Sequence, residues 1–496
     1  MKNVNFYSFI ALYGALFLVL LFKVFHVPVT IDEVPTVYHY SRFSVWKIMM
    51  YPDNIPNNHI LNTLLTKGTI LLFGKEQWVI RLPNLLSFLL FAWGVFRILK
   101  LTLRLDSPWF LAGALLFVNP YLLDFFGLCR GYGISLTMVT LSAGFLLAGF
   151  GEGRHKFIWM ALVCAILASY ANFTALVFWA AVTIIAGFRF LWEYRKNPKQ
   201  LVKPLLLITL LSLAYLALIM VPLQKMHSTN EFQYWTSRGF YHETVISLIH
   251  NWYYNSPVLS MIPHCWMLLP VALALGAALC ASFIRKAVGP GAPESDLACH
   301  PLCGVLAATL VLLPAAINLL QTTILGTPNL SGRTALFFYP LVALLFVIVL
   351  TLAYRWRHSL GHRSLALILT ILLAANLSHR ISLQSVREWE FDSNTLEVID
   401  FLKEKYKGSP ISLKTSWFFH SSFTFYQITG KAPWINLQPY DYNIDIATPA
   451  EYYYIFAEDA AKLNPRFEVV HKFTPDRWLM KKKTNRYVNL ELSPIL

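Results

Sequence analysis

Long apolar stretches recur along almost the whole chain and constrain its fold more than any other feature. A bilayer core is about 30 Å thick, so a helix needs roughly 20 mostly apolar residues to cross it. We count eleven such stretches, at 6–25, 79–99, 109–123, 132–150, 157–169, 171–192, 205–223, 265–284, 302–320, 335–354 and 365–381. The chain is 56% hydrophobic and 14% charged, which soluble proteins of this length do not normally reach. We therefore expect an α-helical polytopic membrane protein of about eleven spans.

Basic residues mark alternate connections between these stretches. Lys and Arg near span ends are retained in the cytoplasm during insertion. They gather at 97–104, 154–156, 189–203, 285–286 and 355–363, whereas the intervening connections are poorer in them. The pattern predicts an N-terminus inside and a C-terminus outside. It also explains the net charge of +15, and because charge is balanced from residue 381 onward, no nucleic-acid partner is expected.

Two domains are expected. Residues 1–383 form the transmembrane domain, whose first outer loop covers 26–78. Within this loop, residues 38–50 suit one helix in the membrane interface, and the apolar run at 60–73 is too short to span comfortably. Residues 384–496 read as a small α/β domain outside the cytoplasm.

The tail carries both helical and strand signals. Asn394 with Glu397 three residues later resembles a capping box, and an apolar stripe continues from there to Tyr406. Strand-like runs follow at 411–413, 452–456, 467–470 and 478–480. A helix followed by a small sheet is therefore predicted.

Two adjacent carboxylates, Asp32 and Glu33, directly follow the first span. Neighbouring carboxylates repel each other, so the pair suggests a bound cation, a basic partner or proton transfer. A solvated loop turn explains it equally well. Both interpretations stay open on the residues alone.

Three further ionisable residues stand at the outer ends of spans. Asp124 and Arg130 share one short connection, where they form either a structural ion pair or part of a cavity, with Arg130 recognising a phosphate. Arg333 opposes the positive-inside trend, although a snorkelling anchor is the alternative. Such residues are costly near lipid and are candidates for function.

The order of short motifs along the chain resembles the GT-C glycosyltransferases, especially the branch of protein mannosyltransferases and lipid A aminoarabinose transferases (glycosyltransferase family 39-like). The resemblance covers most of the chain, and each motif alone is weak. The motifs are Asp32-Glu33, Pro56-Asn57-Asn58-His59-Ile60-Leu61-Asn62, Arg81-Leu82-Pro83, Asp124 with Arg130-Gly131-Tyr132, and Gly332-Arg333 before Tyr339-Pro340.

This resemblance implies an enzyme that transfers a sugar from a polyprenyl-phosphate-linked donor to a hydroxyl of a glycan, lipid or protein, with inversion. Asp32 becomes the candidate base, with Glu33 and Asp124 as further catalytic candidates. Arg130, Arg333 and His59 become candidates for the donor phosphate. At His59 the chain departs from the family pattern, so phosphate binding, metal binding and helix capping all stay open there. No metal site is assigned, and a divalent ion is left open as cofactor.

The expected location is the bacterial inner membrane, with the active site and the C-terminal domain on the periplasmic side. A multi-span transporter or lipid flippase is the rival from another class. The absence of an inverted repeat and the crowding of ionisable residues at outer span ends weigh against it. An O-antigen ligase or polymerase is a second rival, but such enzymes place their basic residues in a late outer loop.

The orientation can be tested with reporter fusions. Alkaline phosphatase folds only where its disulfides form, so a fusion after Leu496 should be active. A fusion after Arg154, in an expected cytoplasmic connection, should be inactive and serves as the control. An inactive fusion at Leu496 beside a fluorescent cytoplasmic reporter there would contradict the predicted topology.

Overall fold

The computed structural model divides the chain into two compact units. It describes residues 1–228, 239–254, 270–280, 301–356, 360–440, 442, 450–463 and 466–483. The membrane unit comprises Met1–His26 and Pro35–Glu388. The C-terminal unit comprises Val27–Val34 and Trp389–Leu496. The eight residues that follow the first span therefore belong to the same unit as the tail.

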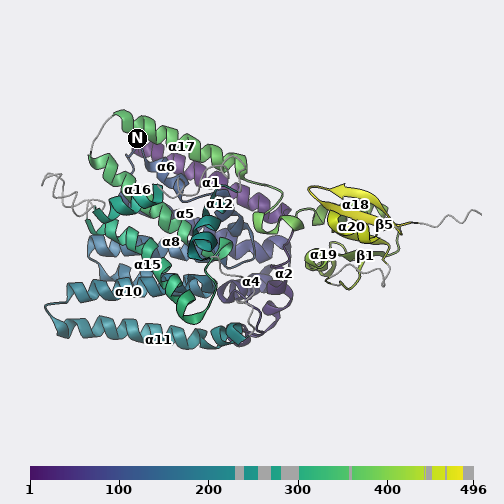
Figure 1. Ribbon diagram of the computed structural model, residues 1–496, viewed down its shortest axis with the longest axis horizontal. Coiled ribbons are helices and arrows are strands. Elements are labelled where there is room, and N and C mark those ends of the chain that lie inside the picture. The colour runs from purple at the N-terminus through teal and green to yellow at the C-terminus, as the bar shows by residue number, and fades with distance from the viewer. Residues whose placement is uncertain are drawn as a thin grey trace, which may run out of the picture. The chain divides into compact units, whose positions relative to one another are not determined.

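The membrane unit is built of helices (Figure 1). Up to the second long helix they are α1 (Lys2–His26), α2 (Val34–Tyr38), η1 (Tyr40–Arg42), α3 (Val45–Met49), α4 (Ile60–Phe73) and α5 (Gln77–Thr102). Next come α6 (Phe110–Leu116), α7 (Pro120–Asp124), η2 (Phe125–Gly127), α8 (Tyr132–Glu152), α9 (His155–Ala171), η3 (Phe173–Ala175), α10 (Leu176–Glu193) and α11 (Pro198–Ser228). The remainder are η5 (Tyr241–Ile246), α12 (Ser247–Trp252), α15 (Pro301–Leu325), η7 (Gly332–Ala335), α16 (Phe338–Trp356) and α17 (Leu360–Arg380).

The described helices confirm an integral membrane protein. Seven of them are long and apolar enough to cross a membrane, and an eighth span arises if the bent pair Phe110–Leu116 and Pro120–Gly127 is counted as one. Three more of the eleven expected spans correspond to shorter apolar helices, His155–Ala171, Pro270–Cys280 and Phe338–Tyr354. The rest of the expected span at 265–284 and the basic residues at 285–286 lie outside the described residues.

The span expected at 109–123 is not one straight helix, because the chain bends there by 62°. Asn119 ends the first half in extended backbone, and its side chain accepts a hydrogen bond from the Leu122 backbone N–H at 2.8 Å. Pro120 then occupies the first turn of α7. An Asn cap followed by Pro starts a new helix in place of continuing the old one.

Small residues let the central helices approach closely. Helix α8 packs against α5 and α9, and 83% of its apolar stretch is buried inside the protein. A Cβ added to Gly144 would lie 3.1 Å from the Ile98 side chain, and one on Gly149 would lie 2.5 Å from Ile158. Packing through small residues of this kind is the usual basis of helix association in lipid.

The single interfacial helix expected at 38–50 is also wrong. The chain forms three short helices there, α2, η1 and α3, and Ser44 caps the last of them. Lysines from longer helices donate to carbonyl groups of this segment, one inside η1 and one just after α3. Lys67 of α4 donates to the Ser41 carbonyl at 2.7 Å, and Lys225 of α11 donates to the Tyr51 carbonyl at 2.5 Å.

The C-terminal unit is a small α/β domain, as expected. Its sheet has the strand order β2-β1-β3-β5-β4, in which β1 runs parallel to β2 and β3, and β5 runs antiparallel to β3 and β4. The strands are β1 (Ile411–Thr415), β2 (Ile435–Leu437), β3 (Tyr452–Phe456), β4 (Phe467–Phe473) and β5 (Arg477–Lys482). The helices are α18 (Thr395–Lys405), α19 (Trp417–Ile428), η9 (Ala457–Asp459) and α20 (Ala460–Leu463), preceded by η8 (Arg387–Asp392), whose first two residues belong to the membrane unit.

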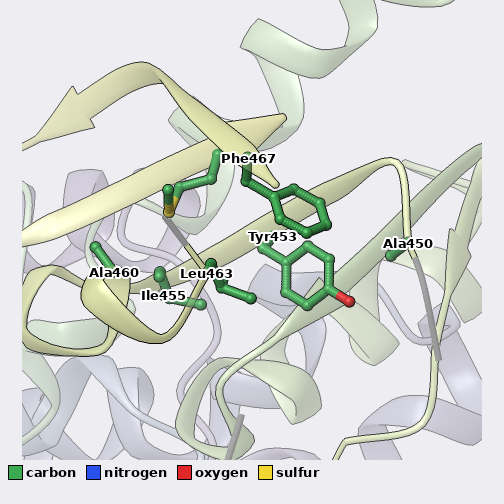
Figure 2. Packing of buried hydrophobic residues seen from close by; sticks show 7 residues of the cluster. Ala450, Tyr453, Ile455, Ala460, Leu463 and Phe467 are labelled. Carbon is green, nitrogen blue, oxygen red and sulfur yellow. The ribbon is translucent and has the colours of Figure 1, made fainter. Parts of the chain in front are cut away.

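One face of this sheet buries a compact apolar cluster (Figure 2). The Tyr453 and Phe467 rings meet edge to face at 4.7 Å between centroids. The other members are Ala450, Ile455, Ala460, Leu463 and Met480. The cluster joins β3, β4, β5 and α20, so the unit has its own hydrophobic core.

Helix α18 forms as predicted, but the expected capping box at its start is wrong. The Asn394 backbone is already in the helical region and its side chain makes no capping hydrogen bond. Its amide nitrogen donates to the Glu397 carboxylate at 3.1 Å, and its oxygen accepts from Arg477 at 2.9 Å. Arg477 on β5 therefore donates to the Asn394 side-chain oxygen that a capping hydrogen bond would have used.

Candidate active site

The segment Val27–Val34, here called the acidic loop, is held by hydrogen bonds to three successive backbone N–H groups. The Val29 N–H donates to the Tyr426 hydroxyl at 2.9 Å, and the Ile31 N–H donates to Asp392 at 2.9 Å. Between them, the Thr30 N–H donates to the Glu33 carboxylate at 2.9 Å. Buried backbone donors need such partners, and here side chains supply all three.

The two carboxylates of the acidic loop differ in environment. Glu33 is fully buried and closes the turn onto the Thr30 N–H, while its own N–H donates to the Thr30 carbonyl at 3.0 Å. Asp32 is only partly buried. A side chain that closes a local turn is engaged in structure, and Asp32 is the more exposed carboxylate of the two.

A third carboxylate, Asp392, supports this loop and was not among the residues expected from the sequence. It is 1% exposed and accepts hydrogen bonds from the Ile31 N–H and, at 2.7 Å, from the Ser422 hydroxyl. Burial raises the pKa of Asp392 to about 8 against the effect of these two hydrogen bonds, and the charges of Asp32 and Glu33 raise it further.

In the membrane unit, His59 is a buried, neutral imidazole. It stands just before α4, and its Nδ1 lies 3.2 Å from the Ala171 carbonyl at the end of α9. A carbonyl can only accept, so Nδ1 carries the hydrogen and Nε2 is left as an acceptor. Burial lowers the pKa of His59 well below its usual value, and the charges of Arg130 and Arg333 lower it further, opposed by the Ala171 hydrogen bond.

One of the three roles left open for His59 is excluded. The residue precedes α4 in the capping position, but its side chain makes no capping hydrogen bond. Within the described part of the chain, its buried Nε2 has no hydrogen-bond partner. The described residues also bring together no three His, Cys, Asp or Glu side chains that could hold a metal ion, and we assign no step to one.

Arg130 and Arg333 lie close enough to His59 for their charges to act on it. Arg130 hydrogen-bonds the Asn57 side chain and, at 3.3 Å, the Asn57 carbonyl. Arg333 lies 4.0 Å from the Glu388 carboxylate, with about a third of its side chain exposed. The charges of both arginines therefore reach His59, the third residue expected to meet a phosphate.

Asp124 is paired with a residue other than the Arg130 that shares its connection. Its carboxylate lies 2.5 Å from the Lys23 ammonium of α1, and both side chains are buried. The Tyr254 hydroxyl and the Arg387 backbone N–H donate to its second oxygen at 2.5 and 3.0 Å. Both carboxylate oxygens are thus engaged, which favours a structural role because a buried charge must be compensated on all sides.

Comparison with known proteins gives similarity at the level of structure. No family model matches the sequence, and no curated protein matches it. The chain is similar to the crystal structure of ArnT from Cupriavidus metallidurans in the apo state, with a TM-score of 0.45 and 14% identity over 95% of this chain and 97% of that one. It is also similar to the same protein bound to undecaprenyl phosphate, with a TM-score of 0.44 and 12% identity over 96% and 98% of the two chains.

ArnT is a lipid A aminoarabinose transferase of the GT-C class, the class that the motif order of this sequence resembles. Similarity at this identity and TM-score assigns neither residues nor a substrate to this chain. The roles proposed below therefore rest on its own side chains.

Gly131 offers a test of this geometry. A Cβ at this position would lie 1.9 Å from the Ala171 carbonyl oxygen, which His59 also contacts, and 3.0 Å from the His59 Cβ. Gly131→Ala should therefore lower the melting temperature of the purified protein by several degrees, since relieving such an overlap typically costs about 1–3 kcal/mol. The measurement is thermal unfolding in detergent.

Gly68→Ala is the matched control, because nothing lies within 4 Å of a Cβ there and Ala favours the helix that contains it. Its melting temperature should be equal or higher. A Gly131→Ala protein as stable as the control would contradict the close approach of Gly131 to the end of α9.

Proposed function

We propose that this chain is a polyprenyl-phosphate-sugar-dependent glycosyltransferase. It moves a sugar from a lipid-linked donor to a hydroxyl of a glycan, lipid or protein acceptor at the outer, periplasmic face of a bacterial inner membrane. The observation that carries the proposal is the contrast between buried Glu33 and partly exposed Asp32 directly after the first span. A donor anchored in lipid presents its head group at the membrane surface, where a carboxylate at a span end is well placed to act.

The proposed base is Asp32. Its carboxylate accepts the proton of the acceptor hydroxyl as the hydroxyl oxygen forms a bond to the anomeric carbon of the sugar. The bond from that carbon to the phosphate oxygen breaks, and its electron pair leaves with the polyprenyl phosphate. Attack from the face opposite the leaving group inverts the anomeric centre. Asp32 then releases the proton to water.

Negative charge on the leaving phosphate is the second requirement of this reaction. Guanidinium groups match phosphate with paired, charge-assisted hydrogen bonds, and the charges of Arg130 and Arg333 both act on His59. A neutral His59 adds no charge to this group, so phosphate binding falls mainly to the two arginines. Its Nε2 is better suited to accept a hydrogen bond from a hydroxyl.

The assignment of the base predicts unequal effects of two conservative variants. Asp32→Asn keeps shape but cannot accept a proton, so transfer should fall by about a hundredfold to ten-thousandfold. Glu33→Gln keeps an oxygen for the Thr30 N–H and should retain most activity. The readout is complementation of a deletion strain, followed by mass analysis of its surface glycans and glycoproteins. Full transfer by a well-expressed Asp32→Asn protein would remove Asp32 from the mechanism.

The assignment of phosphate binding predicts a loss specific to the donor. Arg333→Lys keeps a cation beside Glu388 but loses the paired hydrogen bonds, so KM for the lipid-linked donor should rise roughly tenfold or more. Expression and topology should be unchanged. Arg195→Lys, at an exposed position at the other end of the spans, is the control. An unaltered donor titration for Arg333→Lys would return this residue to the role of a snorkelling anchor.

A further inference from the structure

We infer that Asp392 and Tyr426 of the C-terminal unit are positioning residues that hold the acidic loop in its active conformation. The inference rests on the proposed role of Asp32 as base, and it gives the C-terminal unit a part in the reaction. Neither side chain is placed in contact with substrate. Both act through the loop backbone just before Asp32, at Val29 and Ile31.

The contact with Tyr426 fixes the start of the turn. The Tyr426 hydroxyl accepts from the Val29 N–H at 2.9 Å, and both residues are almost fully buried. Tyr426 lies on α19, one turn after Ser422. Residues four apart lie on the same face of a helix, so one face of α19 reaches the loop directly through Tyr426 and indirectly through Ser422.

Asp392 completes this arrangement by linking the helix to the loop. One of its oxygens accepts from the Ile31 N–H at 2.9 Å and the other from the Ser422 hydroxyl at 2.7 Å. The accepted N–H belongs to the residue directly before Asp32. The turn is therefore held at Val29 by Tyr426, at Thr30 by Glu33 and at Ile31 by Asp392, which leaves the backbone before the base little freedom.

Burying Asp392 near other acidic groups carries a cost in stability. The charges of Asp32 and Glu33 in the loop raise the pKa of Asp392. Burial raises the pKa of Tyr454 on β3, and the charge of Asp392 adds to that rise. Its pKa of about 8 lies above the value of about 3.9 for an unfolded aspartate. Between these values the folded chain holds a proton that the unfolded chain has released, so the free energy of unfolding falls as pH rises.

Hydrogen exchange tests the arrangement without any assay of transfer. In the full-length protein, Asp392→Ala and Tyr426→Phe should speed amide exchange in the peptide that contains residues 27–34. Asp392→Asn should keep the wild-type protection, because its amide oxygen can accept from Ile31 and its amide nitrogen can donate to Ser422. Ser421→Ala, at a partly exposed position on α19, is the control for a change on the same helix.

Kinetics then separate positioning from folding. A displaced base should lower kcat by on the order of tenfold to a hundredfold in Asp392→Ala, with KM for the lipid-linked donor unchanged. Asp392→Asn should restore kcat, and its melting temperature should fall less between pH 5 and pH 8 than that of the wild type. If Asp392→Ala fails to fold, the comparison of Tyr426→Phe with Ser421→Ala decides the question.

Wild-type exchange and kcat in Tyr426→Phe and in a folded Asp392→Ala would overturn the inference. Equal losses of kcat in the Ala and Asn variants would also overturn it, because Asn preserves both hydrogen bonds. Failure of the proposed function has a different signature. In that case Asp32→Asn would stay active, while the exchange results would still follow the hydrogen bonds of the loop.

Discussion

The backbone N–H groups of the acidic loop need partners, and meeting this need sets much of the local structure. A helix satisfies its N–H groups internally, but the chain leaves the helical conformation after α1 and its next residues are buried. Three side chains therefore supply the acceptors, and two of them come from Asp392 and Tyr426 of the C-terminal unit. This explains why Val27–Val34 forms one unit with a domain that begins more than 350 residues later.

Three buried ionisable groups, Asp124, His59 and Asp392, offset the cost of burial in different ways. Asp124 is paired with Lys23 and receives two further hydrogen bonds. His59 loses its charge beside two arginines, and the raised pKa of Asp392 reflects the cost of burying it near two carboxylates. Asp32 and Arg333 are instead partly exposed, so their side chains are more accessible than these buried groups. This contrast supports the roles proposed for them.

Much of the fold could be predicted from local sequence pattern. The apolar stretches mark helices because lipid demands both apolar side chains and internal backbone hydrogen bonds. The strands of the tail follow from short β-prone runs between turns, and only the three-residue β2 was missed. The residues proposed for the site were found because charge near lipid is costly, so the few charged side chains at outer span ends stand out.

The partners of those residues were decided by the tertiary structure alone. Asp124 pairs with Lys23, 101 positions away, although Arg130 is near in sequence. Asn394 is drawn from its capping role by Arg477 on β5. The sequence around Asp392 contains no motif that marks it for function. Its role follows only from the hydrogen bond that it accepts from the Ile31 N–H, 361 positions away. Sequence periodicity reports which face of an element is apolar, whereas the competition among distant donors and acceptors is settled only when the elements pack.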